Sequence, residues 1–219
     1  MAAVKALIFD FDGLIVDTET SIYIAWKELY TSQGQTLSLS DYIRCVGSTF
    51  SEYDPMKVLE ERCEHEIDWE PLILTKDSRI KELHEGLGPL GGVEELLASA
   101  QDHGVPCAVA SSSEDHWVEP WLEKIGLRGA FDCIRTRSAN LPPKPAPDLF
   151  LAAADGLGVA PGEALVFEDS ANGLRAALVA GIRCWMVPNP ITEQSDFSGA
   201  DRILGSLTEV NLPELVAAQ

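Results

Sequence analysis

Short apolar runs alternate with helical patterns through most of this chain. The apolar runs predict buried strands at residues 4–9, 105–110, 131–134, 164–167 and 182–187. Between them, helices are predicted at residues 93–100, 114–125, 148–157 and 172–180, with Ser113 as the N-cap of the second. Strands that alternate with helices favour parallel pairing, with helices covering the sheet. We therefore predict an α/β fold built on a parallel sheet.

Residues 17–87 break this alternation, because their patterns are helical with little strand character. Helices are predicted at residues 22–32, 41–45, 55–63 and 76–85, followed by a glycine-rich turn at residues 86–92. We interpret residues 17–87 as a helical insertion, and residues 1–16 and 88–219 as the remaining domain. The insertion carries 15 acidic and 7 basic residues. Its acid-rich run at residues 60–66 is typical of a solvated helix face.

The chain is strongly acidic, with a formal net charge of −19 over 219 residues. Nucleic acids and anionic membranes bind basic surfaces, so we expect neither as a partner. The five cysteines contain no Cys-x-x-Cys pair, which favours reduced thiols in the cytoplasm. The N-terminal apolar run is too short and too acidic for a signal peptide, and no run approaches the roughly 20 residues of a membrane span. The sequence leaves both monomer and dimer open.

Two aspartates follow the first predicted strand, in the sequence Phe9-Asp10-Phe11-Asp12-Gly13. Ligands of open α/β sheets bind at the carboxyl ends of the strands, where these side chains are expected. Two carboxylates this close repel one another unless a cation or a proton lies between them. The pair therefore indicates a functional site, although a polar turn would have the same composition.

Three further groups follow other predicted strands or lie in loops. Ser111 and Ser112 come directly after the second strand, where a hydroxyl and free backbone N–H groups can bind phosphate. Lys144 stands among four prolines that restrict its position. Glu168 and Asp169 end a further strand, and such hard oxygen ligands suit Mg²⁺. Each group alone could be structural, but together they supply what phosphoryl transfer requires.

In this order, the four groups resemble the four motifs of the haloacid dehalogenase-like superfamily. The longer strings FDFDGLIVDTE, KPAPDLF and EDSANGLRAALVAG are similar to its subgroup of β-phosphoglucomutases and small-metabolite phosphatases with a helical cap after the first motif. The resemblance spans nearly the whole chain. It implies a Rossmann-like core and a helical, C1-type cap in the insertion.

The resemblance also implies a role for each matched residue. Asp10 is expected to be the nucleophile that forms an aspartyl-phosphate, and Asp12 the general acid and base. Mg²⁺ is expected to bind the Asp10 carboxylate, the Asp12 carbonyl and Asp169, with Glu168 nearby. The remaining residues are expected to bind or neutralise the phosphoryl group: Ser111, Ser112, Lys144 and, beside the site, Asn172.

The expected activity is Mg²⁺-dependent hydrolysis of a small phosphorylated metabolite such as a sugar phosphate. The alternative is a phosphomutase of the β-phosphoglucomutase type. Mutases carry a cap histidine where this chain has Ile22. They also carry a Lys and an Arg near a cap glycine, which we match to Gly47; the nearest matches to that Lys and Arg in this chain are Val46 and Phe50. These departures favour hydrolysis, although Arg44 could still reach the site. Asp12 and Asp169 argue against haloacid dehalogenase activity, and the intact motifs against a non-catalytic binding protein.

The remaining aromatic and histidine residues match none of these motifs. Most of the cap aromatics are expected in a core, with one or two lining the substrate pocket: Tyr23, Trp26, Tyr42, Phe50, Tyr53 and Trp69. The four histidines are expected to be surface or structural residues: His65, His84, His103 and His116.

Overall fold

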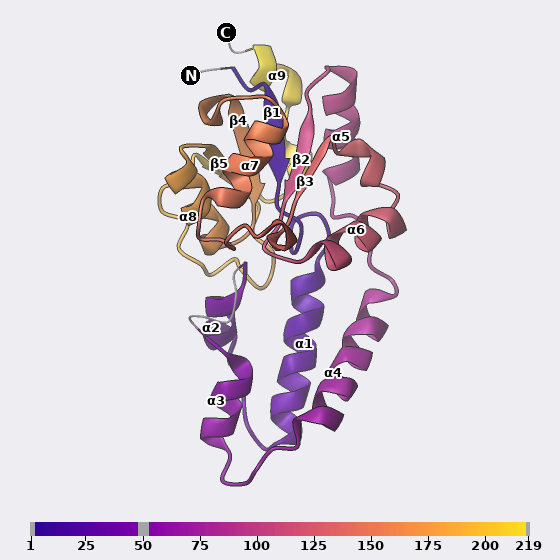
Figure 1. Cartoon of the computed structure of the whole chain (residues 1–219), viewed down its shortest axis with the longest axis vertical. Helices are drawn as coiled ribbons and strands as arrows, with labels where there is room; N and C mark the ends of the chain where they lie inside the picture. The colour runs from indigo at the N-terminus through magenta and orange to yellow at the C-terminus, as the bar shows by residue number, and fades with distance from the viewer. Residues whose placement is uncertain (1–2, 48–52, 218–219) are drawn as a thin grey trace.

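The structure is a computed structural model. It describes residues 3–47 and 53–217, except for the side chain of Ala139. Phe50 therefore lies outside the described residues. Helices and strands alternate along most of the described chain, and the helices of residues 17–87 lie beyond one end of the sheet (Figure 1).

One parallel sheet of six strands occupies the centre of the described structure, in the order β3-β2-β1-β4-β5-β6. This confirms the predicted fold class and all five predicted strands. The sixth, β6, is a two-residue edge strand that no sequence pattern indicated, because it is short and exposed. The strands are β1 (Ala6–Phe9), β2 (Cys107–Ala110), β3 (Cys133–Arg135), β4 (Ala164–Glu168), β5 (Arg183–Met186) and β6 (Arg202–Ile203).

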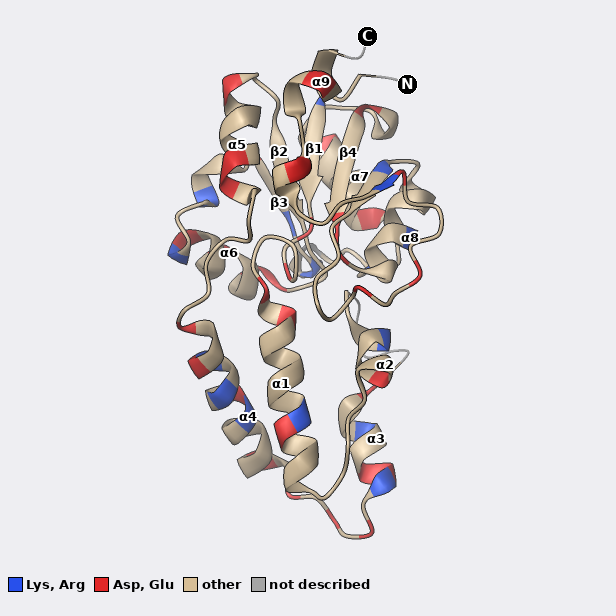
Figure 2. Ribbon diagram, turned by 180° about the vertical axis from the view of Figure 1, so that it is seen from behind, with Lys and Arg blue, Asp and Glu red and all other residues tan. Residues whose placement is uncertain are grey.

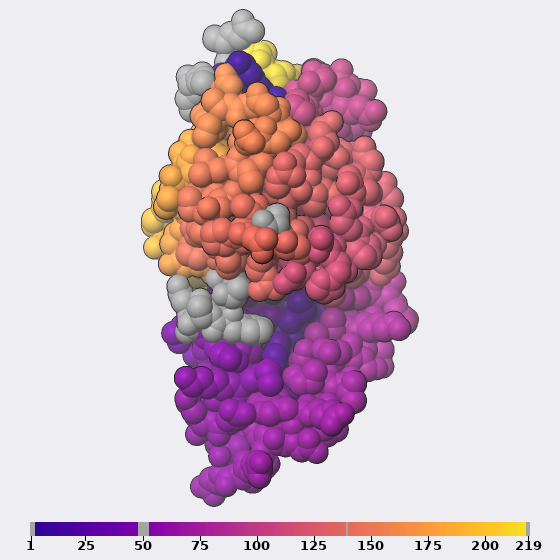
Figure 3. Space-filling model, in the orientation of Figure 1, coloured from indigo at the N-terminus to yellow at the C-terminus, as the bar shows by residue number. Residues whose placement is uncertain are grey.

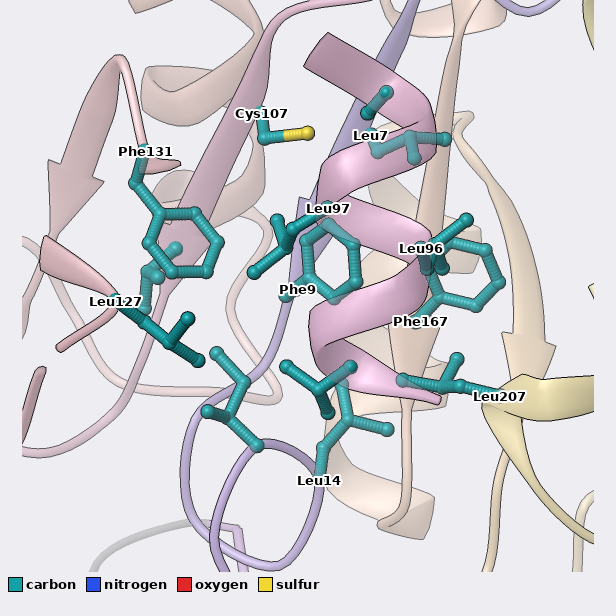
Figure 4. Close-up of a cluster of buried hydrophobic side chains, with 14 of the residues drawn as sticks. Leu7, Phe9, Leu14, Leu96, Leu97, Cys107, Leu127, Phe131, Phe167 and Leu207 are labelled. Carbon is teal, nitrogen blue, oxygen red and sulfur yellow. The ribbon is translucent and has the colours of Figure 1, made fainter. Parts of the chain in front are cut away.

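Helices bury both faces of the sheet, which is why β1 reads as a continuous apolar run. Leu7 and Phe9 point to one face, where α5 (Val93–Asp102), α6 (Asp115–Lys124) and α9 (Leu212–Ala217) pack. Figure 4 shows Leu97 of α5 beside Phe9 and Leu96 beside Phe167. Ile8 points to the other face, against α7 (Asp148–Gly156) and the alanine-rich α8 (Ala171–Ala180).

The described part of residues 17–87 consists of helices and connecting loops, without a strand. The helices are α1 (Thr18–Ser32), α2 (Leu39–Tyr42), α3 (Pro55–Arg62) and α4 (Trp69–His84). They share a hydrophobic cluster around Trp26, Tyr30 and Leu59, which Ile191 from the loop after β5 also joins. In Figure 1 these helices lie beyond the carboxyl ends of the strands, where the arrow of β1 points. Short 3₁₀ turns complete the structure at Ile43–Cys45, Arg128–Ala130, Arg137–Ala139, Pro161–Glu163 and Leu207–Glu209.

Three local predictions were wrong. Helix α1 begins at Thr18 rather than residue 22, because Asp17 caps it by accepting a hydrogen bond from the Thr20 N–H at 3.1 Å. Helix α4 begins at Trp69 rather than residue 76, since Pro71 lies in its first turn, where proline is tolerated. Ser113 is not an N-cap: α6 begins after Glu114, and the Ser113 hydroxyl bonds to Asp12 instead.

All five cysteines are free thiols, and four of them are buried. Among the described residues, no helix is long and apolar enough to cross a membrane.

Candidate active site

The sheet brings the sequence motifs together at the carboxyl ends of its three central strands. In the parallel register, Phe9 of β1 faces Val109 of β2 and Phe167 of β4. Asp10, which follows β1, therefore lies between Ser111, which follows β2, and Glu168 at the end of β4. Side chains separated by more than 100 residues in the sequence thus share one edge of the sheet.

Lys144 lies at the centre of this group and is fully buried. Its ammonium donates hydrogen bonds to Asp10 Oδ1 and, at 2.6 Å, to Glu168 Oε1. Its backbone N–H donates to Ser112 Oγ at 3.1 Å, which fixes the loop beside β2. Burial lowers the pKa of Lys144, but the carboxylates of Asp10 and Glu168 raise it by more, so its pKa lies above the ordinary value. The lysine is therefore charged.

Glu168 accepts hydrogen bonds on both carboxylate oxygens. Oε1 accepts from Lys144, while Oε2 accepts from the backbone N–H groups of Asp169 and Ser170, at 2.9 and 2.8 Å, and from the Ser170 hydroxyl. Gly173 permits this arrangement, since a Cβ there would lie 1.7 Å from Oε1. These contacts fix the side chain of Glu168 in a position where it orients Lys144.

Asp10, Glu168 and Asp169 place three carboxylates within 4.8 Å of one another, all buried. Burial raises the pKa of Asp10 to about 8, with further increases from Glu168 and Asp12, although Lys144 opposes them. Burial, followed by the charges of Glu168 and Asp10, also raises the pKa of Asp169 well above its ordinary value. One ammonium does not balance three carboxylates. The donor set therefore fits a hard divalent cation such as Mg²⁺, which binds carboxylate oxygens.

Asp12 accepts hydrogen bonds from three side chains that surround it. Oδ1 accepts from the Thr18 hydroxyl at 2.6 Å and from the Trp117 indole N–H at 2.9 Å. Oδ2 accepts from the Ser113 hydroxyl at 2.6 Å. These donors come from α1, α6 and the loop after β2, so three elements fix the orientation of this carboxylate.

Asn189, which follows β5, fixes Asp169. Its side-chain amide donates to Asp169 Oδ2 at 2.7 Å and to the Gly13 carbonyl at 3.1 Å. Gly13 adopts φ +86°, and a Cβ there would lie 2.5 Å from both Asn189 Nδ2 and Asp169 Oδ2. The glycine of the first motif is thus required both by its backbone conformation and by the closeness of its neighbours.

The loop after α2 contacts the same edge of the sheet. Ser112 Oγ donates to the Gly47 carbonyl at 3.2 Å, and Asn172 Nδ2 donates to the Val46 carbonyl at 2.8 Å. Ser111 is buried beside them and accepts from the Ser113 N–H at 3.0 Å. The amide of Asn172 thus bonds to the α2 loop, while its predicted contact with phosphate stays a prediction.

Glu19, near the start of α1, is a further, partly buried acid at this site. The Tyr42 hydroxyl donates to its Oε2 at 3.3 Å. Burial raises the pKa of Glu19 to about 8, and the charges of Asp12 and Asp10 add to the increase. A glutamic acid in this setting is protonated over much of the neutral range.

Sequence reasoning missed Thr18, Glu19, Trp117 and Asn189. Asn189 had a usable signal, since it follows a predicted strand, as the other motifs do. Thr18, Glu19 and Trp117 lie on helices, where their spacing is indistinguishable from that of ordinary helix residues.

The family comparison agrees with this geometry. Residues 7–187 match the haloacid dehalogenase-like hydrolase family, a span that contains all four sequence motifs. YhcW of Bacillus subtilis (strain 168) is 40% identical over 213 residues, covering 97% of this chain and 96% of that protein. The fructose-1-phosphate phosphatase YqaB of Escherichia coli (strain K12) is 33% identical, covering 80% of this chain and 92% of YqaB.

A similar solved structure is the Rhodobacter sphaeroides CbbY variant in complex with xylulose-(1,5)bisphosphate. It superimposes with a TM-score of 0.77 at 29% identity, covering 97% of this chain and 99% of that one. The order of the strands, the carboxylates gathered at one edge of the sheet and these matches all indicate the same protein family. This chain belongs to the haloacid dehalogenase-like hydrolase family and is a hydrolase of the phosphatase kind.

Proposed function

We propose that the protein is a Mg²⁺-dependent phosphatase that hydrolyses a small phosphorylated metabolite through an aspartyl-phosphate. The observation that carries this proposal is the ion pair of Asp10 with the fully buried Lys144. Asp10 directly follows the central strand β1, and the carboxylate of Asp12, two residues later, is held by hydrogen bonds. The similarity to phosphatases such as YqaB supports it.

The proposed reaction has two displacements at phosphorus. A carboxylate oxygen of Asp10 attacks the phosphorus while the bond to the leaving oxygen breaks, and protonated Asp12 gives its proton to that oxygen. Asp12 then takes a proton from water, whose oxygen attacks the aspartyl-phosphate. Inorganic phosphate leaves, and the Asp10 carboxylate and protonated Asp12 are regenerated.

The other side chains neutralise and position the phosphoryl group. Lys144 supplies fixed positive charge beside Asp10, while Ser111 and the backbone N–H of Ser112 donate to phosphoryl oxygens. Mg²⁺ would be held by the carboxylates of Asp10 and Asp169 and the carbonyl of Asp12, with Glu168 nearby; when bound, it supplies further positive charge for the phosphate dianion.

Residues 17–87 act in this proposal as a cap over a core made of residues 1–16 and 88–219. The bonds from Ser112 and Asn172 to the α2 loop support the role of a cap, since they hold residues 17–87 against the edge of the sheet where the site lies. Closure of such a cap excludes water and selects the leaving group. Ile22 is an apolar cavity residue where a mutase has histidine, which favours hydrolysis over phosphomutase activity.

A phosphate-release screen over phosphorylated metabolites with Mg²⁺ tests the proposal. We expect release from at least one metabolite, and a loss of at least about a thousandfold in Asp10→Asn, because an amide is a poor nucleophile. Circular dichroism of the variant should match the wild type. Persistent turnover in folded Asp10→Asn would sink the mechanism. Interconversion of β-glucose 1-phosphate and glucose 6-phosphate with little free phosphate would establish the mutase instead.

A further inference from the structure

The two carboxylate oxygens of Asp12 have different surroundings. Oδ1 accepts hydrogen bonds from the Thr18 hydroxyl at 2.6 Å and from the Trp117 indole N–H at 2.9 Å. Oδ2 accepts from the Ser113 hydroxyl at 2.6 Å. A carboxylate oxygen offers about two lone-pair positions. Within the described part of the chain, both positions on Oδ1 are therefore occupied, whereas one position on Oδ2 stays open.

The three donors differ in what they can do when Asp12 carries a proton. A hydroxyl both donates and accepts, so the side chains of Thr18 and Ser113 can turn and accept a hydrogen bond from protonated Asp12. The indole N–H of Trp117 only donates. A proton on the lone pair of Oδ1 that faces Trp117 would therefore meet another hydrogen, which excludes a proton from that position.

Contacts with neighbouring rings hold the indole of Trp117 in place. Trp117 lies on α6, and its ring centroid is 6.2 Å from that of Trp121 and 5.7 Å from that of the His84 imidazole. His84 is buried, and its ring centroid is 5.2 Å from that of Trp121, so the three rings contact one another. To swing its N–H away from Asp12, the indole would have to break these contacts.

The three rings lie where the chain enters and leaves the helices of residues 17–87. Thr18 begins α1, His84 ends α4, and the Lys124 ammonium of α6 donates to the His84 carbonyl at 2.8 Å. In Figure 3 the atoms of α4 meet those of the sheet region along one side, beside a hollow with the indigo atoms of α1 at its floor. The two donors to Asp12 Oδ1 thus come from different parts of the molecule, and both bonds form only when these parts lie together.

We propose that Trp117 is a positioning residue of the reaction: it keeps a proton off Oδ1 of Asp12, so that Oδ2 carries the proton given to the leaving group. This rests on the proposed phosphatase function. In the first displacement, the proton moves from Oδ2 to the leaving oxygen while the bond from that oxygen to phosphorus breaks. In the second, the open lone pair of Oδ2 accepts a proton from the attacking water. Trp117 acts through Asp12 and transfers no proton itself.

The leaving group distinguishes this role from simple packing. A buried indole N–H usually finds a hydrogen-bond partner, so the bond to Asp12 alone does not decide between them. An alkyl phosphate needs a proton on its leaving oxygen, whereas acetyl phosphate releases acetate, a stable anion that needs none. The readout is kcat/KM, because it reports the steps through the first displacement, in which the leaving group departs.

Trp117→Phe keeps an aromatic ring and removes the donor. It should lower kcat/KM by about 10- to 100-fold for the alkyl phosphate that the wild type hydrolyses best in the phosphate-release screen. For acetyl phosphate, the change should stay within about threefold. Because Phe is smaller than Trp, a second variant carries β-(3-benzothienyl)alanine at this position, which keeps the shape of tryptophan but has sulfur in place of the N–H. The same selective loss is expected.

Trp121→Phe is the matched control. Trp121 lies on the same helix and contacts the same imidazole, but in the described structure no hydrogen bond joins it to Asp12. This variant should keep kcat/KM within about threefold of the wild type for both substrates.

The outcomes separate this proposal from the proposed function. Equal losses for both substrates in the benzothienyl variant, or full kcat/KM for the alkyl phosphate, would overturn the role of Trp117 and leave the phosphatase intact. Failure of the wild type to release phosphate from any alkyl phosphate would overturn the proposed function, and the role of Trp117 with it.

Discussion

Lys144 is a buried cation whose charge serves two carboxylates at once. It contacts Asp10, which the proposed reaction uses, and Glu168, whose other oxygen is held by the start of α8. Removing one member of a buried ion pair leaves an uncompensated charge, which costs more than the pair contributes. The residue that neutralises the phosphoryl group in the proposed reaction is thus also one on which the folded state depends.

Lys144→Met should therefore lose both stability and activity. We expect a fall in the free energy of unfolding of about 3 kcal/mol at pH 7, because Glu168 is left buried and unpaired. The double variant Lys144→Met/Glu168→Gln should recover most of that stability while phosphate release stays at least about a hundredfold below wild type. Urea unfolding and phosphate release measure the two effects. Recovery of activity in the double variant would contradict the role given to Lys144.

Glu19 makes the free energy of unfolding fall as pH rises, whereas a salt-bridged carboxylate makes it rise. Its pKa is about 8 in the folded state against an ordinary value of 4.5, so the folded state binds the extra proton between these limits. Stability therefore falls as pH rises from about 4.5 to 8. Glu19→Gln removes this contribution and should stabilise the protein by on the order of 2 kcal/mol at pH 8.5, with little effect at pH 4.5. Urea unfolding in EDTA at both pH values checks this; equal effects at both would contradict it.

At the scale of the element, the start of α8 depends on close approach between Gly173 and Glu168. Gly173→Ala would place Cβ 1.7 Å from Glu168 Oε1, so either the helix or the carboxylate must move. We expect a loss of about 2–4 kcal/mol in thermal unfolding, together with reduced activity, because Lys144 loses its orientation. Gly162→Ala is the control, since nothing lies within 4 Å of its added Cβ. Equal melting temperatures for the two variants would refute this account.

The elements show where sequence reasoning succeeds. Strands buried on both faces, such as β1 and β4, are visible as apolar runs, and motif residues at their ends can be placed without a structure. Helix starts were less predictable, as Asp17 and Pro71 show, because they depend on single caps and tolerated prolines. Ser113 shows the deeper limit: its local pattern favours an N-cap, but a carboxylate 101 residues away takes its hydroxyl. The contacts of Trp117 and Glu19 arise in the same way, from packing between distant elements.

At the scale of the whole molecule, excess negative charge is spread over both the sheet region and the helices of residues 17–87. Figure 2 shows acidic residues in both parts, with lysines and arginines interleaved along α3 and α4. In a chain with a net charge of −19, a phosphate dianion binds only where attraction to nearby positive groups exceeds repulsion by the surrounding acidic residues. Lys144 alone does not provide this, because Asp10 and Glu168 already use its charge.

Removal of divalent cations should therefore abolish phosphate release, and Mg²⁺ should restore it. Added KCl should not substitute for Mg²⁺, since salt screens buried charges weakly. Binding has a second readout in the melting temperature, which Mg²⁺ should raise by relieving repulsion among Asp10, Glu168 and Asp169. Asp169→Asn should lose most of this rise, while Asp102→Asn, at an exposed acid that ends α5, should keep it. Full activity in EDTA, or an equal rise in both variants, would show that the three carboxylates do not hold the cation.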